Sequence, residues 1–252
     1  MTSYLVFDLY GPIASFGDTA VGEYRPTYSY PSKSSIVGLV AAALGIERDH
    51  EERLQSLSSN LGFAVLVLSR GILLRDYHTI QVPSSVRLKK RPVRTRKDEL
   101  AVDDVNTILS TRDYRMDSLY RIALWSKSED FYLDDIKEAL CFPKFTLYLG
   151  RKSCPPALPL KPEIVKAEKV EDALIVNSLP LEFLGPLLKV DYDSKYPIYK
   201  DVDFNESTGN LYQVMRRDRL ISRRKWQYGE REEIMQFVGG EDVFQQNTKM
   251  QQ

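Results

Sequence analysis

The sequence predicts an α+β fold of the ferredoxin-like (RRM-like) kind, built from two strand–helix–strand units that share one sheet. Three observations lead to this prediction. Apolar runs of strand length alternate with runs of helical spacing, a polar stretch separates the two halves, and 252 residues are enough to bury a sizeable core. We therefore expect one elaborated domain, or a domain with a smaller appendage.

The first unit opens with a short strand. Residues 4–9 are mostly apolar and are followed by Gly11 and Pro12, which should end the strand. A loop punctuated by glycine and proline follows. A helix then begins at Ser32, a good N-cap residue, and its apolar spacing continues to Gly45, a typical helix stop. This part of the chain therefore predicts a strand, a loop and a buried helix.

A second short helix is expected over residues 49–58, with Leu54 and Leu57 facing inward. The nearly continuous apolar run 61–68 has the length of a buried strand. Residues 75–115 then interrupt the regular pattern, because they are polar and basic and contain little that could join a core. A long polar insertion between core elements is usually a functional arm.

The second unit begins with a strand at 119–125, followed by a helix that Asp130 should cap and Pro143 should end. The apolar face expected for this helix consists of Leu133, Ile136 and Leu140. Residues 145–155 then form a strand or extended piece that enters a turn.

The final strand is hard to place, and residues 166–176 are one candidate for it. Past this point the apolar pattern is weak and prolines are frequent. We expect a ferredoxin-like domain over residues 1–176 and a small β-rich region of short strands or hairpins over 177–252.

Charge is balanced overall but not evenly spread. Lysine and arginine number 35, aspartate and glutamate also 35. One stretch without an acid contains seven basic residues: Arg87, Lys89, Lys90, Arg91, Arg94, Arg96 and Lys97. A second block holds Arg216, Arg217, Arg219, Arg223, Arg224 and Lys225, with Asp218 as its one acid. Opposite charges on separate faces would suit a subunit that holds a polyanion on one side and proteins on the other. Solvated loops are the plain alternative.

Enzyme motifs are nearly absent. The chain has two histidines, His50 and His78, and no Gly-x-Ser-x-Gly elbow. Residues 150–153 echo a phosphate-binding loop, but the upstream glycine is replaced by Phe145. No cluster has metal-ligand spacing, so we expect neither a metal nor a cofactor. The alternative is a metal-independent ribonuclease in which His78 acts as the base, although a single imidazole supplies no separate acid.

The cysteines and the apolar runs bear on location. Cys141 and Cys154 do not form a disulfide framework or a zinc site, which favours a reducing compartment. No secretory signal or membrane-length apolar stretch is present. We expect a cytoplasmic protein without a membrane partner.

The residues indicate nucleic-acid binding more strongly than catalysis. The segment 31–34 opens a helix whose first amides, with Lys33, suit a phosphate, although an ordinary serine cap explains it equally well. Residues 150–153 combine close backbone approach with two cations and a hydroxyl. The arm mixes basic residues with Tyr77, His78 and Tyr114, which allows bases to stack while phosphates are neutralised. RNA is the best prediction for the ligand.

At this level of detail the chain resembles a known family. The shared segments, in order, are Gly11-Pro12, Phe16-Gly17, 25–27, 31–34, 38–46, 74–79, 112–114, 123–125 and 148–155. A looser likeness continues through Ser222-Arg223, Trp226 and Gly239-Gly240. In these segments the sequence resembles the CasD family, subunits of the type I-E CRISPR Cascade complex.

The resemblance implies a repeat-associated RNA-binding fold with a protruding thumb at about 75–115. Such a subunit caps the complex backbone, holds the 5′ handle of the guide RNA (crRNA), and contacts the backbone subunit CasC and the large subunit CasA in antiviral DNA interference. Target DNA near the thumb is a further possible partner. A related branch cleaves precursor crRNA, whereas type I-E leaves that step to CasE. We therefore expect binding without catalysis, with a processing endoribonuclease as the alternative.

The resemblance also implies which residues meet RNA. Ser32, Lys33 and Ser34 would contact handle phosphates, and Gly150, Arg151, Lys152 and Ser153 would form a glycine-containing RNA loop. Arg75, Tyr77 and His78 would lie at the base of the thumb. Arg87, Lys89, Lys90 and Arg112 are further candidates for RNA contact, but the basic run 87–97 is richer than the family pattern and could instead reach target DNA or a neighbouring subunit. Arg25 and Thr27 match the family motif but could equally buttress the surface. Phe16 stands where the family usually has Trp, which can change a stacking contact.

Overall fold

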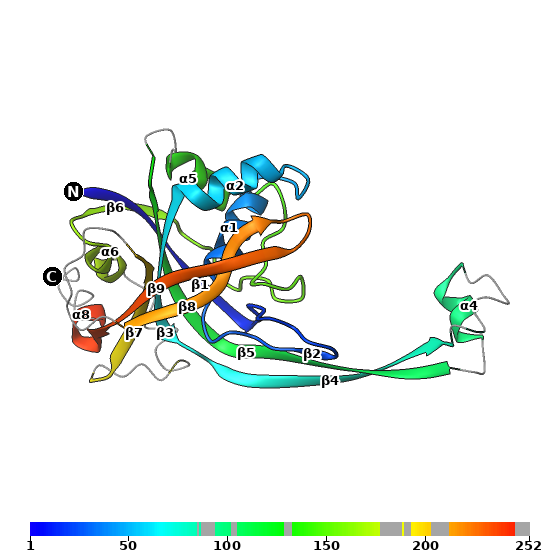
Figure 1. The fold of residues 1–252 in the computed structure, drawn as a ribbon. Coiled ribbons are helices and arrows are strands. Elements are labelled where there is room, and N and C mark those ends of the chain that lie inside the picture. Colours follow the sequence, from blue (N-terminus) through cyan, green and yellow to red (C-terminus); the bar gives the residue numbers. More distant parts are fainter. Residues whose placement is uncertain are drawn as a thin grey trace.

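One sheet runs through the part of the chain that the structure describes, a computed structural model covering residues 1–84, 86, 94–101, 105–128, 133–176, 188, 193–202 and 212–244. It has nine strands in the order β6-β1-β5-β3-β7-β9-β8, with β2 and β4 also paired to β5 (Figure 1). The strands are β1 (Thr2–Ala14), β2 (Tyr24–Arg25), β3 (Leu61–Ser69), β4 (Ile72–Pro83), β5 (Val105–Ser126), β6 (Glu163–Ala167), β7 (Lys195–Asp201), β8 (Tyr212–Ser222) and β9 (Gln227–Gly239). The described helices are α1 (Lys33–Leu44), α2 (Glu51–Asn60), α4 (Arg96–Leu100), α5 (Leu133–Cys141), α6 (Val170–Val176) and α8 (Gly240–Phe244). The fold is therefore mixed α/β and dominated by its sheet.

The predicted helix after residue 32 is confirmed as α1. The Oγ atom of Ser32 accepts from the amide of Ser35 at 3.1 Å, as an N-cap should. Gly45 ends the helix with φ of 72°, a left-handed conformation that glycine adopts without steric cost. Leu54 and Leu57 of α2 are buried, which confirms the second helix and its inward face.

The predicted core strands are confirmed, but two of them are longer than the apolar runs suggested. β1 continues past Gly11 and Pro12 to Ala14 against β5. Pro12 has no partner in that register, so its missing N–H does not break the ladder. β5 extends from the predicted run 119–125 back to Val105.

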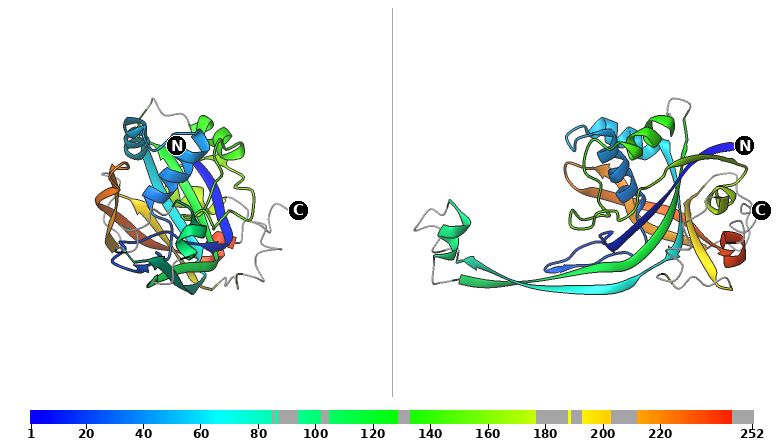
Figure 2. Two further views of the ribbon diagram at one scale, coloured as in Figure 1. Left: turned by 90° about the vertical axis from the view of Figure 1, so that its right-hand side faces the viewer. Right: turned by 180° about the vertical axis from the view of Figure 1, so that it is seen from behind.

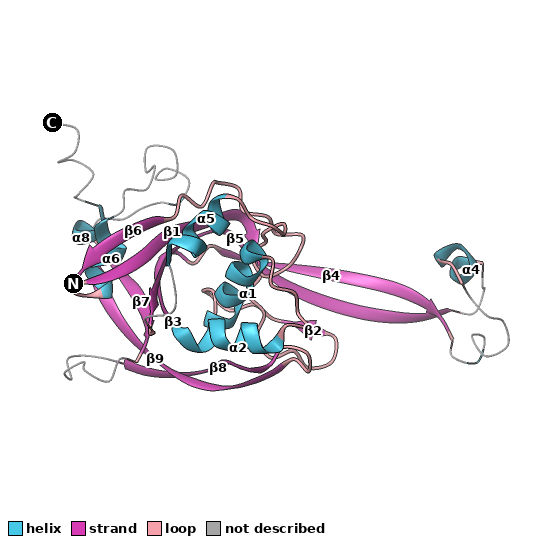
Figure 3. Cartoon of the chain, turned by 90° about the horizontal axis from the view of Figure 1, so that it is seen from above, coloured by secondary structure: helices cyan, strands magenta, loops and turns pink. Residues whose placement is uncertain are grey.

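Both faces of the central strands are covered. Helices α1, α2 and α5 lie on one side of the sheet, while α6 and α8 pack on the other (Figures 1 and 3). Along β1, Leu5 and Phe7 face the larger core, and Tyr4 and Val6 face the smaller one. This explains why the strands read as continuous apolar runs and not as an alternation. Helix α5 buries Leu133, Ile136 and Leu140 as predicted, while Asp130 lies outside the described residues.

The predicted arm is a long hairpin. β4 pairs with the N-terminal part of β5 from Ile72↔Met116 to Pro83↔Val105. It projects far from the rest of the molecule and carries α4 near its end (Figures 2 and 3). The sequence predicted the protrusion but not its strands, because most β4 side chains are exposed and show no apolar alternation. The predicted RNA contacts Arg87, Lys89 and Lys90 lie outside the described residues.

The candidate final strand at 166–176 is wrong over most of its length. The strand is β6, which pairs with β1, and the chain then turns into α6. Val170, Ala173 and Leu174 have helical spacing and are buried together, so packing decides for a helix there. The expected hairpin in the C-terminal region is confirmed as β8–β9, which joins the same sheet through β7. The division at residues 176/177 stays a prediction.

Candidate nucleic-acid interface

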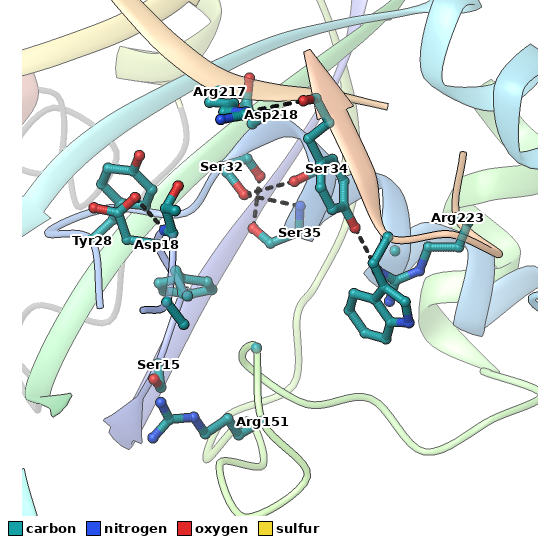
Figure 4. Close-up of a pocket in the computed structure, with 18 of the residues that line it drawn as sticks. Ser15, Asp18, Tyr28, Ser32, Ser34, Ser35, Arg151, Arg217, Asp218 and Arg223 are labelled. Atoms are coloured by element: carbon teal, nitrogen blue, oxygen red, sulfur yellow. Dashed lines mark hydrogen bonds between the residues drawn. The ribbon is translucent and has the colours of Figure 1, made fainter. Parts of the chain in front are cut away.

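A groove of about 1040 Å³ lies beside the start of α1 (Figure 4). Five separate parts of the chain line it: residues 15–28 between β1 and α1, helix α1 from its first turn, Arg48 in the turn after α1, the loop 148–151, and the β8–β9 hairpin. The predicted RNA contacts Arg25, Ser32, Ser34, Gly150 and Arg151 all belong to this lining. Segments distant in sequence therefore converge on one surface, although Lys33 and the predicted contacts at the base of the arm, Arg75, Tyr77 and His78, are not part of its lining.

The lining is rich in guanidinium groups. It includes five arginines, Arg25, Arg48, Arg151, Arg217 and Arg223, against the two aspartates Asp18 and Asp218. Asp218 already accepts from Arg231 Nε at 2.8 Å, which offsets its charge. The groove therefore carries an excess of positive charge in a concave surface, where a field that attracts a polyanion is concentrated.

Lys33 lies inward and not on the groove. Its ammonium is 2.7 Å from Asp201 Oδ2, its backbone amide donates to Asp218 Oδ2 at 2.8 Å, and only 8% of its surface is exposed. This position differs from the exposed phosphate contact that the sequence suggested. Ser32 and Ser34 do line the groove, with their Oγ atoms 3.1 Å apart.

A buried ionic cluster holds the hairpin against α1. Arg231 of β9 contacts Asp201, Asp218 and Glu233 at 2.9, 2.8 and 2.7 Å, and Tyr30 donates to Glu233. Although burial acts in the opposite direction, Lys33, Arg231 and Lys127 together hold the pKa of the Asp201 carboxyl below its ordinary value. The cluster joins β7, β8, β9 and the start of α1, so it positions two walls of the groove.

The loop at Gly150 requires glycine. Its φ is 86°, and a Cβ atom at this position would lie 1.8 Å from the carbonyl oxygen of Ser15. Such close backbone approach brings Arg151 to the groove, where its Nη2 donates to the carbonyl of Arg25 at 3.2 Å. The Arg151 guanidinium also lies 4.7 Å from the ring centre of Tyr114. Lys152 and Ser153 are exposed just beyond the lining.

The base of the arm is a second polar cluster. Arg75 donates to both oxygens of Asp113, at 2.9 and 3.2 Å, and to the hydroxyl of Tyr24 at 3.0 Å. Tyr24 in turn donates to Asp113. Hydrogen bonds from Arg75 and Tyr24 hold the pKa of Asp113 below its ordinary value despite its burial. Arg75 is therefore engaged in fixing β2 to the hairpin.

The remaining predicted residues divide between the arm and its support. Tyr77 is 61% exposed, and His78 contacts Asp76 on the same strand. Arg112 pairs in register with Arg25, which connects the arm to the groove through β2. Thr27 accepts from the amide of Phe16 at 3.0 Å, so it supports the loop that forms one wall.

Sequence reasoning missed the hairpin wall of the site. Arg217, Arg223 and Trp226 line the groove, and they belong to the second basic block or directly follow it. The block alone could not assign them, because its neighbour Arg216 is buried between Tyr28 and Tyr30. An aromatic residue next to this run of cations was the available signal. Arg48, in an acidic stretch, gave none.

The described residues contain neither a metal-ligand cluster nor a membrane-spanning helix. Among them, no group of three histidine, cysteine or carboxylate side chains could hold a metal ion. None of the described helices is both long enough and apolar enough to cross a bilayer.

Comparison with known proteins defines the class. The family model for CRISPR-associated protein (Cas_Cas5) matches residues 4–233. The chain therefore belongs to the Cas5 family of CRISPR-associated proteins, and the resemblance stated from its motifs is confirmed.

Individual proteins show how similar this chain is to characterised members of the family. The chain is 33% identical over 184 residues to the CRISPR system Cascade subunit CasD of Escherichia coli K12, covering 69% of this chain and 77% of that protein. A chain of a CRISPR RNA-guided surveillance complex aligns with a TM-score of 0.64 and 25% identity, over 94% of this chain and 89% of the other. A crystal structure of a Cas protein aligns with a TM-score of 0.59 and 22% identity over 96% and 97%, which shows the shared fold alone.

Proposed function

We propose that this chain is a non-catalytic subunit of a type I-E Cascade complex that grips the 5′ handle of the crRNA. Membership of the Cas5 family and the similarity to CasD support this function. The observation that carries it is the groove, where five arginines from separate segments surround one concave surface. Guanidinium groups bind phosphate in a bidentate fashion, so this surface suits a ribose-phosphate strand.

The architecture supports a ferredoxin-like frame for the N-terminal part. Its four strands have the order β6-β1-β5-β3 and its pairs are antiparallel. Helices α1 and α2 lie between β1 and β3 in the chain, and α5 lies between β5 and β6. This order of elements supports the proposed β-α-β-β-α-β frame.

The arm has a different role in the proposal. It extends beyond the groove and presents Tyr77 and His78 on exposed strand surface, so it can lie across the guide strand next to the handle. The backbone subunit CasC and the large subunit CasA are the proposed protein partners.

The salt dependence of RNA binding tests this function. If each groove arginine neutralises about one phosphate, log affinity for single-stranded RNA should fall with log salt at a slope of roughly −3.5, from the single-strand coefficient of about −0.7 per phosphate. The double variant Arg151→Ala, Arg217→Ala should reduce the slope by roughly 1.4. Lys166→Ala, an exposed cation on the edge strand β6, is the matched control and should leave the slope unchanged. A wild-type slope near zero would contradict an electrostatic grip.

A processing endoribonuclease is the second candidate, because the contact of His78 with Asp76 could orient an imidazole as a base. We favour binding alone. The other histidine, His50, lies just before α2 and away from the arm, so it does not supply a second imidazole next to His78. Incubation of the chain with repeat RNA without metal decides between them. Discrete cleavage that disappears in His78→Ala would establish the enzyme, and intact RNA would dismiss it.

A further inference from the structure

The turn between β8 and β9 presents a large aromatic side chain at the groove. Trp226 is 59% exposed and belongs to the groove lining. The chain's other tryptophan, Trp125, is 6% exposed and packs in the smaller core. An indole kept this open forgoes most of the stabilisation that its burial would supply. Core packing therefore does not account for a tryptophan at this position.

The backbone at Trp226 is also unfavourable for such a residue. Its φ is 53°, in the left-handed region, and its amide donates to the carbonyl of Arg223 at 3.3 Å to close the turn. Glycine or asparagine is preferred in this conformation, and a bulky side chain there is strained. Strain at an exposed residue on a binding surface points to a use for that side chain outside folding.

Two cations accompany the ring. The Arg223 guanidinium carbon lies 4.1 Å from the ring centre, and that of Arg48 lies 5.4 Å away. Arg223 Nη1 also donates to the hydroxyl of Tyr228 at 2.5 Å, which fixes it on the hairpin. Arg48 comes from the turn after α1, so two walls of the groove meet at this tryptophan. A partly exposed aromatic ring with guanidinium groups over it is the chemistry with which proteins hold single-stranded nucleic acids, because bases stack on aromatic rings and on guanidinium planes alike.

We propose that Trp226 is a base-stacking platform of the groove. An unpaired base of single-stranded RNA stacks on the exposed part of the indole, while Arg48 and Arg223, which lie over the same ring, neutralise the neighbouring phosphates. The inference rests on the proposed RNA-binding function and adds a base contact to a site otherwise made of phosphate contacts. Stacking tolerates every base, so this platform holds the strand without reading its sequence.

Binding of two probes to the full chain tests the platform: a fluorescein-labelled single-stranded RNA octamer of mixed sequence, and an abasic ribose-phosphate octamer of the same length. Trp226→Ala should weaken binding of the base-containing octamer by about fivefold or more, since one stacked base contributes about 1–3 kcal/mol. Binding of the abasic octamer should change by less than about twofold, because both arginines remain. Trp226→Phe keeps a ring and should stay within about threefold of wild type.

Tyr212→Ala is the matched control. Tyr212 is 58% exposed on the same hairpin but does not line the groove, so its loss should leave both affinities unchanged. Tryptophan emission gives an independent readout that does not need the alanine variant to fold. The octamer should quench wild-type emission, and the quenching should disappear in Trp226→Phe while binding persists.

Failure of RNA binding and failure of the stacking platform give different results. If the wild type binds neither octamer, the RNA-binding function fails and the platform fails with it. If the wild type binds RNA but Trp226→Ala binds equally well, or quenching persists in Trp226→Phe, the platform alone is overturned. Trp226 would then be an anchor for a protein subunit, as exposed tryptophans at interfaces often are.

Discussion

The groove and the arm are both polar and both rich in cations, yet they are built in opposite ways. The groove joins five segments, and a buried ionic cluster around Arg231 fixes two of its walls. The arm is one hairpin whose register follows from neighbouring strands, and most of its β4 side chains are exposed. The groove therefore holds its groups in fixed positions, whereas the arm supplies reach.

This difference has an energetic consequence. A buried charge that loses its partner is expensive, because no water replaces the lost contact. An exposed pair on the arm loses little, because solvent solvates both partners. Substitutions under the groove should therefore disturb the whole fold, and substitutions on the arm should act locally.

The largest effect is expected for Asp201→Ala. It leaves Lys33 and Arg231 buried without their shared carboxylate, and breaking a buried pair in this way costs about 3–5 kcal/mol. Urea unfolding measures the loss. Asp49→Ala removes an exposed aspartate in the turn before α2 and should change stability by less than about 0.5 kcal/mol. A loss below about 1 kcal/mol for Asp201→Ala would show that the cluster does not support the groove.

Acid should reveal the same cluster in the wild-type protein. Because the pKa of Asp201 is lowered on folding, the unfolded chain binds the proton more readily, and stability falls as pH drops from the ordinary carboxyl value through the lowered one. Unfolding free energies of wild type and Asp201→Asn, measured across that range, should converge as pH falls. A constant difference between them would contradict the lowered pKa.

Gly150→Ala should have the next largest effect. A new methyl group would meet the Ser15 carbonyl in a backbone conformation that alanine rarely adopts, which costs roughly 2–3 kcal/mol. Gly38→Ala is the matched control in the same groove. Apart from its flanking residues and the backbone of its own helix, nothing lies within 4 Å of its added Cβ. It is in the interior of α1, so alanine should stabilise the protein by about 0.5–1 kcal/mol. Equal effects at the two glycines would remove the argument for a fixed loop.

The smallest global effect is expected at the base of the arm. Arg75→Ala removes three hydrogen bonds to Asp113 and Tyr24, but its side chain is 56% exposed. Asp113 keeps its bond from Tyr24 but is 3% exposed, so losing Arg75 should cost about 1–2 kcal/mol of unfolding free energy, and amide hydrogen exchange should accelerate most in β2 and in the arm strands. Tyr77→Ala, on the same strand, should change neither. A loss as large as that expected for Asp201→Ala would mean that the arm is coupled to the core.

The elements that were predicted correctly are those with strong local signals. Helix α1 carries its own serine cap and glycine stop, and β3 is one apolar run. The strands of the arm were missed because exposed strands need no apolar pattern when a neighbouring strand supplies their hydrogen bonds. The stretch 166–176 was read as one strand because five residues of strand and seven of helix are too short for a clear period.

The residues of the groove also fall into two groups, those that motifs indicate and those that only packing decides. Motifs alone found Arg25, Ser32, Ser34, Gly150 and Arg151, which the groove brings together. They could not show that Lys33 turns inward, since its partner Asp201 is far away in sequence and belongs to β7. They also could not separate the buried Arg216 from its groove neighbour Arg217.

The sequence by itself determined the helices with caps, the apolar strands, the presence of an arm and the family, because each is written in contiguous residues. Only the tertiary structure decided which cations face the groove and which are neutralised beneath it. The physical reason is that a charge is exposed or paired according to what packs against it. In this protein Lys33 of the first helix is paired by Asp201 of β7, a strand in the C-terminal part of the chain.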